Sequence, residues 1–222
     1  MQLTVIIPVL NEGKTIKKVL DQVLAEKVSR VVVVDDGSTD ETSKILKNSK
    51  NPKVTVMAHQ ENLGKGAAIR TALQELRDGY FIVQDADLEY NPKQYSELLR
   101  LAKPNVAVYG SRLLADTNAH AYIRTYLGNV FLTKVFNVLF NQNLTDTYTC
   151  YKLILVKVAK KLNLTSNGFE IEAEITGKLA KKGIKIIEVP IRFHPRKYEE
   201  GKKIKAKDAF RGLWTFLKVR FN

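Results

Sequence analysis

The sequence has a single cysteine, Cys150, in 222 residues. One thiol cannot form an internal disulfide, which excludes a disulfide-stabilised secreted scaffold and is typical of a reducing compartment. The chain also lacks an uncharged apolar run of about 20 residues, the length that a membrane-spanning helix needs. Its first residues have neither the basic leader nor the long apolar core of a signal peptide. We therefore expect a cytoplasmic protein that is soluble or bound peripherally at the cytoplasmic face of a membrane.

Acidic residues are scarce too. The 23 Asp and Glu residues face 36 Lys and Arg residues, which gives a formal net charge of +13. So basic a chain attracts anions, such as nucleic acid, phosphorylated small molecules or an acidic membrane surface. The length suits one α/β domain with a full core, and the apolar content of 45% argues against wholesale disorder. We expect residues 1–222 to form a single domain.

Apolar, β-branched runs alternate with segments of helical periodicity in the first half of the chain. Strands are predicted at 3–7, 30–34, 54–58, 80–83 and 106–109. Helices are predicted at 15–27 and from about 38 to 50, after the stretch 62–68 as far as Arg77, and after Pro92. The run at 30–34 is apolar throughout, which is typical of a central parallel strand. Strands and helices joined by short connections predict a doubly wound, mostly parallel sheet, with ligands outside the carboxyl ends of the strands.

The alternation fails after Arg112. Residues 122–140 predict one or two amphipathic helices, which either pack on the sheet or lie at a membrane interface with their aromatic and basic side chains. A helix is predicted at 169–182, and an exposed or edge strand at 184–193, where Pro190 favours the edge. The last predicted helix, 206–221, has a broad apolar stripe around Trp214.

Acids and glycines gather after the predicted strands. Polar clusters occupy 8–12, 35–40, 62–66, 85–89 and 110–112. Because the carboxyl ends of parallel strands meet at one edge of a sheet, we expect these clusters to form one ligand site there.

Asp85 and Asp87 are the most informative pair, because they come directly after a buried strand. On a regular strand, residues two apart point to the same face. Two like charges buried together need a cation or donors to neutralise them. Mg²⁺ and Mn²⁺ bind one or two carboxylates while substrate phosphates complete their shell. The alternative is a solvated acid pair that caps the next helix.

Two further clusters indicate nucleotide binding. Asp35 and Asp36 end a predicted strand, where a carboxylate can accept hydrogen bonds from a base or a ribose; the alternative is helix capping by Asp36 or Ser38. Residues 62–66 resemble a phosphate loop but lack the full Walker spacing. Lys65, at a helix N-terminus, would face a phosphate.

Taken in order, these motifs resemble glycosyltransferase family 2, the inverting enzymes with a GT-A fold, and within it the polyprenyl-phosphate (dolichyl-phosphate) mannosyl- and glucosyltransferases. The segments that carry the resemblance are 7–12, 34–40, 62–66, 85–88, 110–112, 144–152, 188–191 and 196–203. The resemblance implies a Rossmann-like sheet with amphipathic interface helices and a C-terminal helix. Residues 1–112 would form the nucleotide-sugar half, and 113–222 the acceptor half.

The resemblance also implies an activity: metal-dependent transfer of a hexose from a GDP-mannose or UDP-glucose type donor to a polyprenyl or dolichyl phosphate. It implies roles for matched residues as well. The donor nucleotide would be bound by Pro8, Glu12, Asp35, Asp36, Lys65, Asp85 and Ala86. Mg²⁺ or Mn²⁺ would be bound by Asp85, Asp87 and Glu89, and the catalytic residues would be Asp87, Arg112 and Arg196. The acceptor phosphate would be contacted by Arg112, Arg124, Lys202 and Lys203.

The nature of the acceptor decides whether a base is needed. A lipid phosphate is already anionic near neutral pH, because the second pKa of a phosphate monoester is about 6. No strong base is then required, and His59, His120 and His194 show no catalytic constellation. A sugar hydroxyl would need a carboxylate base. Asp146 and Glu172 are the candidates, and their alternative roles are loop hydrogen bonding and helix solvation.

Many members of the family carry C-terminal transmembrane helices, whereas this sequence predicts none. We therefore expect peripheral membrane contact through 122–140, the Trp214 helix and the positive charge. Two other functions stay open: a nucleotidyltransferase, and a non-catalytic basic module that binds a membrane or a polyanion. No nucleic-acid motif is present, so we expect no nucleic-acid partner.

Overall fold

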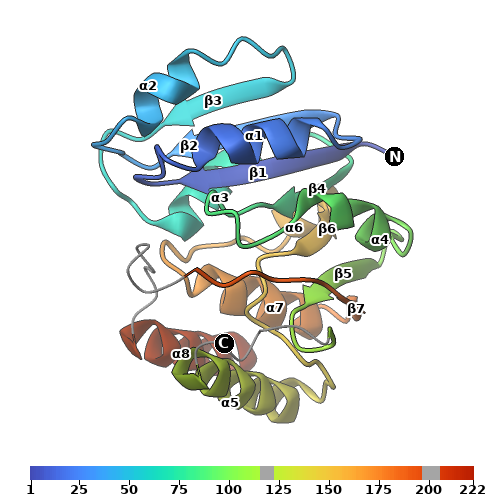
Figure 1. The fold of residues 1–222 in the computed structure, drawn as a ribbon. Coiled ribbons are helices and arrows are strands. Elements are labelled where there is room, and N and C mark those ends of the chain that lie inside the picture. The colour runs from blue at the N-terminus through green and yellow to red at the C-terminus, as the bar shows by residue number, and fades with distance from the viewer. Residues whose placement is uncertain (116–122, 197–205) are drawn as a thin grey trace.

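The computed structural model describes residues 1–115, 123–196 and 206–222. Within them, seven strands form one sheet in the order β3-β2-β1-β4-β6-β5-β7 (Figure 1). The strands are β1 (Leu3–Val9), β2 (Arg30–Asp35), β3 (Val54–Ala58), β4 (Tyr80–Val83), β5 (Val106–Ser111), β6 (Lys152–Leu155) and β7 (Lys185–Pro190). The helices are α1 (Ile16–Leu24), α2 (Thr42–Lys47), α3 (Lys65–Glu75), η1 (Pro92–Gln94), α4 (Tyr95–Leu99), α5 (Ile123–Phe140), α6 (Val156–Lys160), α7 (Ile171–Lys181) and α8 (Ala206–Phe221).

The predicted α/β sheet is confirmed. β1 pairs in parallel with β2 and β4, β2 pairs in parallel with β3, and β5 pairs in parallel with β7. β6 runs antiparallel to both of its neighbours, β4 and β5. β2 therefore lies between parallel strands, and β7 lies at an edge, as their sequences predict.

β6 joins the two parts of the sheet. β5 follows β4 along the chain, but the two strands do not pair, because β6 lies between them. Tyr80 is opposite Leu155, and Val108 is opposite Leu153. Residues from the second half of the chain thus connect the β1–β4 part of the sheet to β5 and β7.

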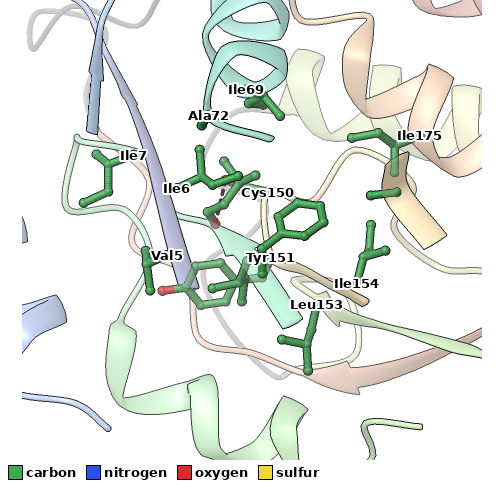
Figure 2. Close-up of a cluster of buried hydrophobic side chains, with 14 of the residues drawn as sticks. Val5, Ile6, Ile7, Ile69, Ala72, Cys150, Tyr151, Leu153, Ile154 and Ile175 are labelled. Atoms are coloured by element: carbon green, nitrogen blue, oxygen red, sulfur yellow. Dashed lines mark hydrogen bonds between the residues drawn. The ribbon is translucent and has the colours of Figure 1, made fainter. Parts of the chain in front are cut away.

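The core lies where the apolar runs predict it. Val31 to Val34 of β2 are fully buried, and each buried Val side chain stabilises the fold by about 1.5–3 kcal/mol relative to exposure. Figure 2 shows the part of the core between β1, α3 and β6, which includes Ile6, Ile69, Cys150 and Ile154. Cys150 is buried there as a free thiol.

Helices α5, α7 and α8 pack together at the end of the molecule that is far from β3 (Figure 1). α8 packs against α7 and α5, and α7 lies between these two helices and the sheet (Figure 1). The predicted helix at 122–140 is the single helix α5. Across the described residues, no helix combines the length and the apolar character needed to cross a bilayer.

The predicted strand at 80–83 agrees with β4 at both ends. β4 ends at Val83, so Asp85 and Asp87 lie in the turn after the strand and not on it. The two side chains do not share a strand face: Asp85 contacts Lys65, and Asp87 contacts Arg196. The turn also contains Leu88 with a φ of 66°, which is left-handed backbone that a strand does not contain.

Candidate active site

Charged side chains meet beyond the carboxyl ends of β1 and β4. Glu12 follows β1, Asp85 to Glu89 follow β4, and Arg196 comes from the segment after β7. Lys65 reaches the same place from the first residue of α3. The structure thus brings together six of the predicted site residues: Glu12, Lys65, Asp85, Asp87, Glu89 and Arg196.

Arg196 holds three acids of this group. Its guanidinium lies 3.0 Å from Glu12 Oε2 and 3.2 Å from Asp87 Oδ2. Its backbone N–H donates to Glu89 Oε1 at 2.7 Å. The acids belong to segments more than 100 residues away in sequence, so only the tertiary fold creates this contact.

Asp85 and Asp87 differ in their electrostatics. Burial opposes ionisation of Asp85, but the Lys65 ammonium, 2.8 Å away, acts together with Cys150 and Arg112 to lower the Asp85 pKa. Burial, followed by the negative charges of Asp85 and Glu89, raises the pKa of Asp87 to about 7. Arg196 opposes this rise without cancelling it. The negative charges of Asp85 and Glu89 thus add to the effect of burial, and another cation would relieve both.

The negative charges that gather at Asp85, Asp87 and Glu89 are the observation that tests whether these residues fit a metal ion. Two neighbouring carboxylates with surplus negative charge fit a hard divalent cation such as Mg²⁺ or Mn²⁺. Over the described part of the chain, no three acidic, His or Cys side chains already converge as a metal site. Oxygens of Asp85, Asp87 and Glu89 instead contact Lys65 and Arg196. The residues fit the ion by their chemistry, and they would have to exchange these contacts to bind it.

Lys65 lies between two carboxylates. Its ammonium is 2.8 Å from Asp85 Oδ1 and 3.1 Å from Glu172 Oε1, and it lies over the ring of Phe169. The other oxygen of Glu172 contacts Lys152, which is 2% exposed. The sequence does not predict that Glu172 contacts Lys65. It does not predict a role for Lys152 either. A lysine at the start of an otherwise apolar strand was the available signal for Lys152.

The phosphate-loop prediction for 62–66 is wrong at its backbone amides. The N–H groups of Leu63 and Gly64 donate to the two carboxylate oxygens of Asp36, at 3.0 and 2.8 Å. His59 also contacts Asp36, at 2.6 Å, and its other ring nitrogen contacts Thr71. A carboxylate of the protein itself thus occupies the donors that a phosphate would need.

The glycines of this segment serve close packing. A Cβ on Gly64 would lie 2.4 Å from the Asn167 carbonyl oxygen, and one on Gly66 would lie 2.4 Å from the Ser166 carbonyl oxygen. Gly64 also has a φ of 102°, which side chains rarely allow. The start of α3 is therefore pressed against the loop that leads into α7.

Asp35 stabilises its own turn. Its carboxylate accepts the N–H of Ser38 at 3.0 Å and the hydroxyl of Ser43. Asp35 and Asp36 are both 3% exposed. The structure shows them as buried supports of the loops beside the site, and their contact with a nucleotide stays a prediction.

Arg112 and Asp146 form a bidentate pair. Arg112 donates through Nε to Asp146 Oδ2 at 2.7 Å and through Nη2 to Oδ1 at 2.8 Å. Asn129 donates to the same carboxylate, and Glu188 accepts the N–H groups of Thr145 and Asp146. Arg112 is thereby fixed at the end of β5. Neither Asn129 nor Glu188 was among the predicted site residues.

Both base candidates contact cations of the protein itself. Asp146 is fully buried, and although burial opposes its ionisation, Arg112 holds its pKa below the ordinary value. Glu172 is 4% exposed, and its two oxygens contact Lys65 and Lys152. A base must reach the proton that it removes, and in this structure the oxygens of both carboxylates contact protein groups instead. Their use as a base stays a prediction.

The other predicted residues are placed as follows. Pro8 lies within β1 opposite Val34, and the carbonyl oxygen of Ala86 accepts the Thr15 hydroxyl at 2.6 Å. Arg124 lies in the first turn of α5, and its side chain is outside the description. Lys202, Lys203 and His120 lie outside the described residues.

Known proteins resemble this chain in sequence. Residues 4–162 match the sequence model described as Glycosyl transferase family 2. The chain belongs to this family. Glycosyltransferase AglJ of Haloferax volcanii is 30% identical over 195 residues, which cover 86% of this chain and 63% of AglJ. Dolichol-phosphate mannosyltransferase of Pyrococcus furiosus is 28% identical over 228 residues, which cover 96% of this chain and 62% of that protein.

Solved structures of other proteins have the same fold as this family 2 glycosyltransferase. Glucosyl-3-phosphoglycerate synthase from Mycobacterium tuberculosis, in complex with Mn²⁺, UDP and phosphoglyceric acid, aligns with a TM-score of 0.72 at 17% identity. The alignment covers 99% of this chain and 78% of that chain. The predicted GT-A type α/β fold is thereby confirmed. The chain spans a little under two thirds of the length of AglJ and of the Pyrococcus furiosus enzyme.

Proposed function

We propose that this family 2 glycosyltransferase transfers a hexose from a nucleotide sugar of the GDP-mannose or UDP-glucose type to a polyprenyl or dolichyl phosphate, with inversion at the sugar C1. Residues 1–112 would supply most of the donor site, and 113–222 the acceptor site. The name of the Pyrococcus furiosus relative, a dolichol-phosphate mannosyltransferase, supports an acceptor of this kind.

The observation that carries the acceptor class is the commitment of Asp146 and Glu172 to buried cations. A hydroxyl acceptor would need a base, whereas a phosphate brings its own negative charge. In the proposed reaction an acceptor phosphate oxygen forms a bond to C1 as the bond from C1 to the diphosphate oxygen breaks. The nucleoside diphosphate leaves with the electron pair, and no proton has to be removed.

The charged residues would then divide the work. Asp85, Asp87 and Glu89 would hold Mg²⁺ or Mn²⁺, which neutralises negative charge on the diphosphate when bound. Lys65 and Arg196 would contact donor phosphates once the acids that now hold them change partner. Arg112, oriented by Asp146, would meet the acceptor phosphate with a fixed fork of N–H donors.

The outer face of α5 and α8 supports peripheral membrane contact. Both helices expose apolar side chains with the same spacing, at positions i, i+4 and i+11: Leu127, Phe131 and Val138 on α5, and Phe210, Trp214 and Phe221 on α8. Lys134, Arg211, Lys218 and Arg220 are exposed beside them. α5 contains no acidic residue, and Asp208 of α8 is buried. A face with apolar, aromatic and basic groups fits an anionic membrane surface.

A glycolipid assay tests the proposal. The purified chain is incubated with a panel of sugar nucleotides, Mn²⁺ or Mg²⁺ and a polyprenyl phosphate, and the lipid fraction is analysed by mass spectrometry. We expect one sugar-phosphate lipid and release of a nucleoside diphosphate. Transfer to the matching polyprenyl alcohol, or release of pyrophosphate from a nucleoside triphosphate, would overturn it.

A further inference from the structure

Four charged side chains of alternating sign run from the active site into the core. Asp85 contacts Lys65, Lys65 contacts Glu172, and Glu172 contacts Lys152. The side chains come from the turn after β4, from α3, from α7 and from β6, respectively. The proposed function uses only the first two of them, so the inner pair needs its own explanation.

The inner end of this row is fixed. Lys152 also donates to the Thr149 carbonyl oxygen at 2.5 Å and lies over the ring of Tyr109. Lys152 and Glu172 are 2% and 4% exposed, so separating them would leave an unpaired charge away from water. Breaking a buried pair in this way typically costs about 3–5 kcal/mol. The Glu172 side chain therefore stays paired with Lys152 when ligands bind at the active site.

The outer end can change partner. The side chain of Asp85 is 22% exposed, against 6% for that of Glu172. A divalent cation at Asp85 would take the oxygen that Lys65 now contacts, and it would repel the ammonium. Lys65 would still have the second carboxylate, because Glu172 Oε1 lies 3.1 Å from the same nitrogen.

The backbone prevents Lys65 from moving away. The close contacts of Gly64 and Gly66 with the 166–167 backbone press the start of α3 against the loop before α7. The N–H of Ala67 donates to the Asn167 carbonyl oxygen at 3.1 Å. Lys65 and Glu172 therefore stay together whichever group occupies Asp85.

We propose that Glu172 is a positioning residue that keeps the Lys65 ammonium beside the active site when a divalent cation takes over Asp85. Lys65 then remains available to a donor phosphate. Without the Glu172 charge, Asp85 would be the only carboxylate left to Lys65 within this row, and the ammonium would compete with the cation. The inference rests on the proposed use of Asp85 as a metal ligand.

Calorimetric titration of the full chain with Mn²⁺, without donor, measures this competition directly. Glu172→Gln should weaken Mn²⁺ binding about tenfold, the lower end of the range for groups that orient metal ligands. Lys65→Met removes the competitor and should tighten Mn²⁺ binding, while it weakens binding of GDP or UDP in the presence of Mn²⁺. In the Lys65→Met background, Glu172→Gln should have no further effect on Mn²⁺ binding, because Glu172 acts through Lys65.

Two controls separate positioning from loss of structure. Lys152→Met and Lys152→Met/Glu172→Gln give the same comparison without an unpaired buried lysine, in case Glu172→Gln alone does not fold. Glu174→Gln makes the same chemical change on the same helix, at a buried glutamate that is paired with Lys178 and accepts the N–H groups of Thr165 and Ser166, but does not contact Lys65. It should lower thermal stability but leave the Mn²⁺ affinity within about twofold.

The outcomes are distinct. A wild-type chain that binds no Mn²⁺ overturns the metal site and this inference together. Normal wild-type binding with an unchanged Glu172→Gln variant overturns the inference and leaves the proposed function standing. Weakening by Glu172→Gln that persists in the Lys65→Met background shows a structural role and also overturns the inference.

Discussion

Two pairs of aspartates lie at the same edge of the sheet, and the fold treats them in opposite ways. Asp36 accepts two backbone N–H groups and contacts a ring nitrogen of His59, and Asp35 accepts the N–H of Ser38 and the Ser43 hydroxyl. Asp85 and Asp87 instead depend mainly on the ends of long cationic side chains. A carboxylate satisfied by backbone donors is a support, because its partners cannot leave without unfolding a loop. A partly exposed carboxylate held by a lysine or an arginine, such as Asp85 or Asp87, can exchange that partner for a ligand.

The largest expected effect is that of a substitution in the Asp85 and Asp87 pair. Asp87→Asn keeps the shape of the side chain but removes the charge that a divalent cation needs. We expect turnover to fall by at least about 10³-fold, which corresponds to about 4 kcal/mol of transition-state stabilisation. The glycolipid assay measures the rate, and circular dichroism checks that the fold is kept. Wild-type turnover in this variant would contradict the proposed role of the pair.

The next largest effect is expected for a substitution in the Asp35 and Asp36 pair. Asp36 is itself buried, and Asp36→Asn leaves one acceptor oxygen for the N–H groups of Leu63 and Gly64, so we expect the free energy of unfolding to fall by about 2–3 kcal/mol. Urea denaturation measures it. Asp40→Asn is the matched control, because Asp40 also accepts two backbone N–H groups but is exposed, and it should cost less than about 1 kcal/mol. Equal losses would show that burial does not set the difference.

Metal binding sharpens the comparison. Mn²⁺ at 100 times its dissociation constant should stabilise the wild-type chain by about 2.7 kcal/mol. Asp36→Asn should keep this increment on its lower baseline, whereas Asp87→Asn should lose most of it. Thermal unfolding with Mn²⁺ and with EDTA gives both values. The comparison fails if the two variants respond alike.

The smallest effect is a pH dependence of the metal-free protein. The folded pKa of Asp87 is about 7, above its ordinary value of 3.8, so the folded state binds the proton more tightly. The associated stability is complete below the ordinary value and is lost as the pH rises toward 7. Since one pKa unit is worth about 1.4 kcal/mol, we expect a loss of about 2 kcal/mol between pH 5 and pH 7. Urea denaturation across this range should show the loss in the wild type and not in Asp87→Asn.

The sequence predicts local structure well here, because its periodicities are strong. The strand at 54–58 and the helix at 206–221 agree with β3 and α8 at both ends. The order of the strands does not follow from such patterns, because the place of β6 depends on pairing between distant segments. Tyr80 and Leu155 meet across the sheet with no local signal for it.

The candidate site shows the same limit. The sequence predicts that acids gather at one edge, since strand ends must meet there. It cannot say which acid is a support, because partners such as Leu63 for Asp36 or Glu172 for Lys65 are far away in the chain. The phosphate-loop interpretation is wrong at the backbone amides for this reason: Asp36 had already taken the N–H groups that the motif seemed to offer.

The place of β6 also constrains how the chain is made. A ribosome releases β4 well before β6, and at 5–20 residues per second the delay is on the order of seconds. Throughout that time the edge of β4 that later pairs with β6 is unpaired in the growing polypeptide, and an unpaired strand edge promotes aggregation with other chains. Nascent molecules of this protein should therefore need shielding by chaperones until Leu155 has emerged and this edge can pair.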